Sequence, residues 1–183
     1  EGLPEDAVDQ ARASLAQHKA AKARALLQRW TKANAEDERY YEALLLLGDT
    51  YFESRDFWKA QTQYEQVAEN ASGELFEQAN RRTVDVARAF LSGQRRIVWG
   101  FLRLPAYPEA LELLDKVWER APGTRLGELA LKIKADYYYN NGDVDLAETE
   151  YANLVQQYPS GRYLQIGMMR SAEAAEAAFP GIK

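Results

Sequence analysis

The chain has 183 residues, of which 46% are apolar and 28% charged, and its net charge is −5 at neutral pH. These proportions are ordinary for a globular protein of one or two domains. The acidic balance argues against nucleic acid as the main partner, because phosphate binding needs a basic face. The chain has no cysteine, which excludes disulfides, thiolate nucleophiles and thiolate metal sites. No segment has the roughly 18 uninterrupted apolar residues typical of a membrane helix.

Apolar periodicity of the helical type, interrupted by turn residues, runs through most of the chain. It predicts an all-α fold without strands, and Asp143 is expected to cap the helix that follows it. The last helix has no partner, and its apolar stripe is expected to pack on the preceding hairpin: Ile166, Met169, Ala172 and Ala175. The expected helices cover about residues 4–17, 19–33, 37–54, 56–70, 74–92, 107–120, 125–141, 143–157 and 160–178.

Small residues recur in pairs at a fixed distance. Three pairs are 12 residues apart and a fourth is 23 apart: Ala11 and Ala23, Gly48 and Ala60, Ala135 and Ala147, and Ala87 and Ala110. Where the two helices of a hairpin pass close together, only Gly or Ala fits. The residues three after each first and four after each second small residue are expected to fill the seams: Ser14, Tyr51, Phe90 and Tyr138, and Leu27, Tyr64, Leu114 and Tyr151. The pattern predicts one domain over residues 1–183, a right-handed α-α superhelix of four tetratricopeptide-like hairpins plus one terminal helix.

The third hairpin contains a turn, over about residues 94–106, that is longer by 11 residues than the pattern requires. Turns between such helices usually have about four polar residues, whereas this one carries six large apolar side chains and three arginines. One interpretation is that the apolar side chains fold back over the end of the hairpin. The others are partner docking and contact with a lipid surface. The residues of the docking interpretation are Arg95, Arg96, Trp99, Phe101 and Arg103.

The first helices of stacked hairpins line the concave side, where their inner faces are free to hold a peptide. Counting from the small residues, Arg88 or Lys132 is placed to hold a terminal carboxylate. The alternative is that Phe52 and Tyr139 only contact the next hairpin and that both cations are solvated. The predicted groove consists of Leu45, Asp49, Phe52, Glu53, Val84, Arg88, Leu91, Lys132, Asp136, Tyr139 and Asn140.

Residues suited to catalysis or metal binding are sparse. His18 is the only histidine and falls in the first hairpin turn, where a solvated residue is commoner than a catalytic base. Residues 140–145 lack the alternating oxygen ligands of a calcium loop and are typical of a hairpin turn. We therefore expect a protein that is not an enzyme, with no catalytic residue, metal site or cofactor.

Two hairpins carry a family resemblance. Their sequences are LGDTYF at 47–52 with AQTQY at 60–64, and ADYYYNNGD at 135–143 with AETEY at 147–151 and Tyr158-Pro159. They resemble the hairpins of BamD-type outer-membrane assembly lipoproteins, which are tetratricopeptide-repeat proteins. The resemblance covers roughly residues 10–178. The long third turn, the missing lipid-bearing cysteine and the incomplete fifth hairpin depart from that family.

The resemblance implies a lipoprotein at the periplasmic face of the bacterial outer membrane that helps assemble and insert β-barrel proteins. It implies a barrel-assembly subunit and unfolded outer-membrane protein peptides as partners, with membrane contact only through a lipid anchor removed upstream of Glu1. The unpaired last helix leads us to expect further repeats after Lys183. The alternative is a periplasmic cell-envelope or cytoplasmic adaptor built from the same repeats.

Overall fold

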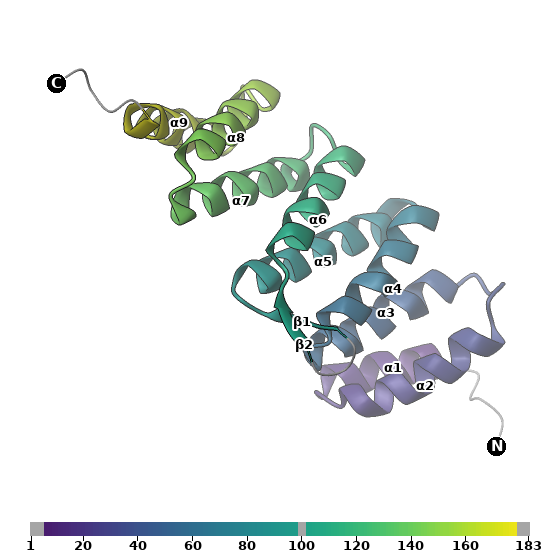
Figure 1. The fold of residues 1–183 in the computed structure, drawn as a ribbon. Coiled ribbons are helices and arrows are strands. Elements are labelled where there is room, and N and C mark those ends of the chain that lie inside the picture. Colours follow the sequence, from purple (N-terminus) through teal and green to yellow (C-terminus); the bar gives the residue numbers. More distant parts are fainter. Residues whose placement is uncertain (1–5, 99–101, 179–183) are drawn as a thin grey trace. The chain divides into compact units, whose positions relative to one another are not determined.

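The computed structural model describes residues 6–98 and 102–178, and helices follow one another along this part of the chain (Figure 1). They confirm the all-α prediction, with bounds that differ by only a few residues from the expected ones. The helices are α1 (Ala7–Ala16), α2 (Ala20–Ala33), α3 (Tyr40–Glu53), α4 (Phe57–Asn70), α5 (Gly73–Leu91), α6 (Tyr107–Arg120), α7 (Arg125–Asn141), α8 (Val144–Gln157) and α9 (Leu164–Ala178).

The long third turn contains two short strands, so the expectation of a fold without strands is wrong in this segment. β1 (Arg95–Val98) and β2 (Leu102–Pro105) pair as a two-stranded sheet. The β-branched Ile97 and Val98 favour an extended backbone. Pairing also satisfies backbone N–H and C=O groups that an irregular turn would leave to water.

The chain divides into two compact units, Glu1–Ala89 with Arg96–Arg103 and Phe90–Arg95 with Leu104–Lys183. In the first unit α1 packs on α2, α2 on α3 and α3 on α4, and α1 also touches α3. In the second unit α6 packs on α7, α7 on α8 and α8 on α9. Within each unit, helices that are neighbours in the chain are therefore neighbours in space, as in an array of helix hairpins.

The small residues of the pattern are buried, which confirms the register of the hairpins. The seven alanines have no exposed surface: Ala11, Ala23, Ala60, Ala87, Ala110, Ala135 and Ala147. The large seam residues of the second helices are also buried, with Tyr64 and Tyr151 the largest of the fully buried side chains. Of the seam residues in the first helices, Tyr138 is only half-buried.

In two hairpins a tyrosine hydroxyl on the second helix reaches an aspartate on the first. Tyr64 donates a hydrogen bond to Asp49 Oδ1 at 2.8 Å, and Tyr151 donates one to Asp136 Oδ1 at 2.6 Å. Each aspartate directly follows the small residue at which the helices approach. The small residue therefore fixes both the helix spacing and this polar contact.

Helix α9 packs through a different face from the one expected. Its buried residues are Gly167 and Ala174, whereas Met169 is 48% exposed. Ala172 is exposed as well, and Ile166 and Ala175 are half-buried. A Cβ at Gly167 would lie 3.0 Å from Val155 Cγ2 of α8, so small residues and not the apolar stripe determine which face approaches α8.

The turn between α7 and α8 differs in one detail from the prediction. Asp143 stands directly before α8, but its side chain makes no capping hydrogen bond. The turn is instead closed by Gly142, which adopts a left-handed conformation with φ of 78° and donates its N–H to the carbonyl of Tyr139. The backbone conformation that glycine allows thus ends α7.

The contact between Gly48 and Tyr64 gives a test of the hairpin spacing. A Cβ at Gly48 would lie 2.4 Å from Tyr64 Cε1, and this ring is fully buried. Replacing Gly by Ala inside a helix normally stabilises a protein by about 0.5–1 kcal/mol. We expect Gly48→Ala to destabilise this one by about 1–3 kcal/mol through overpacking, measured by urea unfolding. In a Tyr64→Leu background the same change should lose most of its cost, and an equal loss in both backgrounds would contradict the ring contact.

Candidate binding cleft

A cleft of about 530 Å³ lies in the first unit. Its walls come from α1, α3 and α5, which are the first helices of the first three hairpins, and from the residue Glu38 just before α3. This is the side of a hairpin stack on which the sequence predicts a groove. The lining residues are Arg12, Glu38, Glu42, Leu45, Leu46, Asp49, Glu74, Leu75 and Gln78.

The apolar part of the cleft is formed by three leucines. Leu45 is buried, and Leu46 on α3 and Leu75 on α5 are half-buried. On α3, Glu42, Leu45, Leu46 and Asp49 are spaced three or four residues apart, so they share one face of the helix. The cleft therefore combines an apolar centre with carboxylates at both ends of the same helical face.

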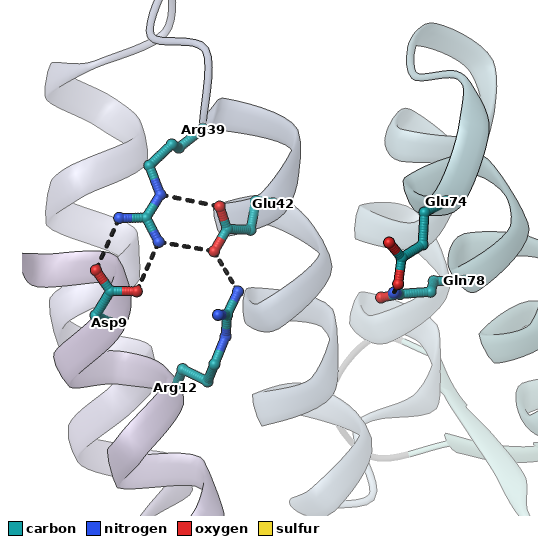
Figure 2. Close-up of polar contacts among 6 residues, drawn as sticks. All are labelled: Asp9, Arg12, Arg39, Glu42, Glu74 and Gln78. Atoms are coloured by element: carbon teal, nitrogen blue, oxygen red, sulfur yellow. Dashed lines mark hydrogen bonds and ion pairs between the residues drawn. The ribbon is translucent and has the colours of Figure 1, made fainter.

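Arg39 joins α1 to α3 beside the cleft (Figure 2). Its Nη1 and Nη2 donate to the two carboxylate oxygens of Asp9 at 2.9 and 2.7 Å. Its Nε and Nη2 donate to the two oxygens of Glu42 at 2.9 and 2.8 Å. Arg12 of α1 also donates to Glu42 Oε1. Two bidentate pairs on one guanidinium fix the relative position of the two helices that form one wall of the cleft.

The arginine contacts change the ionisation of the carboxylate on α1. The hydrogen bond from Arg39 lowers the pKa of Asp9, and the charges of Arg39 and Arg12 act in the same direction. Bonding to Glu42 and Asp9 in turn raises the pKa of Arg39. Arg39 therefore remains charged, and two arginines lie against the carboxylate of Glu42.

Asp49 lies at the other end of the helical face and is held by the protein itself. Burial raises the pKa of its carboxyl, while Arg82 and the hydroxyl of Tyr64 oppose this shift. Arg82 Nε lies 2.9 Å from Asp49 Oδ1, and Arg82 Nη2 donates to Asp49 Oδ2 at 3.1 Å. The carboxylate of Asp49 is therefore already paired, like that of Glu42.

On the α5 wall, Gln78 Nε2 donates to Glu74 Oε1 at 2.8 Å (Figure 2). This bond joins residues four positions apart on one helix and fixes the side chain of Glu74 without neutralising it. Both residues are exposed, as is Glu38 opposite on the approach to α3. The exposed polar rim thus carries carboxylates with different degrees of pairing.

Of the groove residues predicted from the sequence, the cleft brings together Leu45 and Asp49. Phe52 instead packs edge-on against Phe57, with ring centroids 5.1 Å apart, and Glu53 Oε1 lies 2.8 Å from His18 Nδ1. In α5, Val84 is buried, Arg88 is exposed and Leu91 is half-buried. None of these five residues lines the cleft.

The predicted groove residues of α7 are engaged within the second unit. Lys132 Nζ pairs with Asp136, which also accepts the hydrogen bond from Tyr151. Tyr139 donates to Glu173 Oε2 of α9 at 2.9 Å, and the guanidinium of Arg170 lies 4.3 Å from the centre of its ring. Asn140 is exposed. Tyr139 therefore contacts α9, the helix that follows its hairpin, which is the kind of contact that the alternative interpretation describes.

The docking turn predicted over residues 94–106 lies partly outside the described residues. Arg95 and Arg96 belong to β1 and Arg103 belongs to β2. Trp99 and Phe101 lie outside the described residues. The docking interpretation of this turn stays a prediction.

Sequence reasoning missed most of the cleft. Arg12 directly follows the small residue of α1, as Asp49 follows that of α3. Extending the groove count to the first hairpin would have found it. Glu42 and Leu46 were visible as residues on the same helical face as Leu45 and Asp49. The spacing from the small residues does not mark the other four lining residues. Glu38 lies before α3, and Glu74, Leu75 and Gln78 lie several helical turns before Ala87 on α5.

A second cavity, of about 730 Å³, lies in the second unit between the turn before α7 and the turn before α9. Its lining includes Glu128, a buried carboxylate whose Oε1 accepts the N–H of Tyr163 at 2.8 Å. That bond ties α7 to the turn before α9. None of the predicted groove residues lines this cavity.

Among the described residues, no three histidine, cysteine or acidic side chains are grouped as metal ligands would be. The described helices also include none with the length and apolarity needed to cross a bilayer.

Comparisons with known proteins agree with the observed architecture. The family model described as tetratricopeptide repeat matches residues 133–161, which contain much of α7 and all of α8. Two crystal structures of nearly identical TPR-like repeats, from a Podosopora anserina protein described as a kinesin light chain, have TM-scores of 0.53. They are 18% and 16% identical to this chain, and each alignment covers 94% of this chain and 85% of the other. No curated protein gave a match. The chain is an array of TPR-like helix hairpins.

The contact between Asp9 and Arg39 predicts a pH-dependent stability difference. The pKa of Asp9 is lower in the folded chain than its ordinary value of 3.8, so its ionised form stabilises the fold above that pH and the contribution disappears as pH falls through the lowered pKa. We expect Asp9→Asn to lower the urea midpoint at neutral pH and to lower it less at about pH 3, where the ionised form of Asp9 is less populated. In an Arg39→Gln background the substitution should have no further effect at neutral pH. An equal loss at both pH values would contradict the ion pair.

Proposed function

We propose that this protein is a non-enzymatic repeat scaffold that binds segments of partner proteins in the cleft of its first unit. The single observation that carries the proposal is the open cleft of about 530 Å³ on the first helices of three hairpins, with one buried and two half-buried leucines in its centre. Repeat arrays of this kind present such helices as an extended binding surface. A cleft of this size suits a few side chains of an extended or helical segment.

In its finer form, we propose that the scaffold acts in the assembly and insertion of β-barrel proteins at the periplasmic face of the bacterial outer membrane. The support for this is the resemblance of the second and fourth hairpins to those of BamD-type lipoproteins. The same proposal includes a lipid anchor and a barrel-assembly subunit as partner. It also treats residues 1–183 as one repeat domain. A periplasmic or cytoplasmic adaptor is the alternative that rests on the repeats alone.

The scaffold proposal predicts that a charge in the centre of the cleft blocks binding. A photocrosslinking residue at position 46 recovers the partner, which is then purified for direct measurement. Leu46→Arg is expected to weaken its binding by ~10-fold or more, because it places a bulky cation where an apolar side chain is received. The matched control is Leu146→Arg, since Leu146 is 48% exposed and belongs to the other unit.

Both variants should keep the melting temperature of the parent chain to within a few degrees. Equal affinity of the parent and Leu46→Arg for the purified partner would overturn the proposed binding cleft.

The proposed role in outer-membrane assembly predicts that the chain binds a peptide from the C-terminus of a barrel protein. A labelled peptide that copies the aromatic C-terminus of an outer-membrane barrel protein should bind the full chain in fluorescence anisotropy. Arg88→Gln should weaken this binding by ~5-fold or more, because the exposed guanidinium can pair with the terminal carboxylate of the peptide. If the parent chain does not bind the peptide, the outer-membrane role fails while the scaffold proposal stands.

A further inference from the structure

The four carboxylates that line the cleft fall into two classes. Glu42 is paired with Arg39 and Arg12, and Asp49 is paired with Arg82. Glu38 and Glu74 are different, because within residues 6–98 and 102–178 neither has a cation at ion-pair distance. Glu74 has only the amide of Gln78 as a hydrogen-bond partner in the described part of the chain.

The two unpaired carboxylates come from different walls of the cleft. Glu38 precedes α3, which supplies Leu45 and Leu46, and Glu74 opens α5, which supplies Leu75. All five residues line the same cleft. A segment that enters the cleft therefore meets an unpaired carboxylate on the α3 wall and another on the α5 wall, together with the leucines.

The arginines at the cleft do not offset the negative charges of Glu38 and Glu74. Among the described residues that line the cleft, Arg12 is the only positively charged one, and it donates to Glu42. Arg39 lies between Asp9 and Glu42 and donates hydrogen bonds to both carboxylates (Figure 2). An anionic ligand, such as a chain-terminal carboxylate or an acidic peptide, would have to break these contacts and would be repelled by Glu38 and Glu74.

We propose that the cleft selects a partner segment in which one or two apolar side chains are flanked by lysine or arginine. This inference rests on the proposed function and specifies the chemistry of its partner. The apolar side chains occupy the space between Leu46 and Leu75, and the flanking cations pair with Glu38 and Glu74. Long lysine and arginine side chains suit this arrangement, since their apolar stems can lie along the leucines while their charges reach the rim.

Exposed ion pairs are weak individually. The carboxylates of Glu38 and Glu74 therefore affect which segment is selected, and how fast it associates, more than how tightly it binds. The apolar centre provides the larger part of the binding. Because the rim charges are exposed, the preference for a basic segment should decline as salt concentration rises.

The test uses a fluorescent peptide with two leucines between two lysines, blocked at both ends so that it carries no terminal charge. Two matched peptides replace the lysines by glutamates or the leucines by serines. Anisotropy with the full chain should show binding of the first peptide alone. Raising sodium chloride from about 50 to about 200 mM should weaken it severalfold.

The double variant Glu38→Gln with Glu74→Gln is expected to lower affinity for the lysine peptide by about five- to tenfold. Its control is Glu36→Gln with Glu77→Gln, which removes the same charge from exposed neighbours that do not line the cleft. The control pair should change affinity by less than about twofold. A far-ultraviolet circular dichroism melt verifies that both double variants fold like the parent.

Three results would overturn the inference: equal binding of the glutamate peptide, no binding of the lysine peptide, or equal losses in the two double variants. The last result would mean that the acidic net charge of the whole chain attracts the probe. These failures are distinct from failure of the scaffold proposal, because a purified partner whose binding is lost in Leu46→Arg would still identify the cleft as the binding surface.

Discussion

The fold depends on the close approach of paired helices at small residues. At each crossing an alanine or glycine without exposed surface lets a large side chain from the facing helix occupy the seam, as Tyr64 does over Gly48. Close packing there makes even one added methyl group costly. The same approach brings the tyrosine hydroxyl to an aspartate on the first helix in two hairpins. One spacing thus fixes apolar packing and a buried polar contact together.

This constraint also decides which side chains remain for binding. While the seam side of α3 packs on its neighbours, another face of the helix carries Glu42, Leu46 and Asp49, which line the cleft. Arg39 then secures α3 against α1 through two carboxylates. The cleft therefore exists because α1 and α3 are held side by side by ion pairs, some of which involve its own lining residues Arg12 and Glu42.

The sequence predicted the helices and their register well because Gly or Ala is required at each crossing, and no distant contact is needed to recognise the spacing. It predicted the groove poorly for a physical reason. Tyr139 is engaged by Arg170 and Glu173 of α9, and the packing face of α9 depends on Gly167, which an apolar stripe does not reveal. The two strands were missed because each has only 4 residues, which is too short for a clear alternation of apolar and polar side chains.

The charges of the two units bear differently on what each can bind. In the first unit the unpaired carboxylates at the cleft disfavour a C-terminus, because its carboxylate carries a negative charge. In the second unit Lys132 is already paired with Asp136, so a terminal carboxylate would have to compete with an intramolecular partner. Arg88, which is exposed, is the residue from the predicted groove best suited to that task. A role in recognising the ends of barrel proteins would therefore depend on Arg88 and not on the cleft, whereas the cleft suits an internal, cation-bearing segment of a partner.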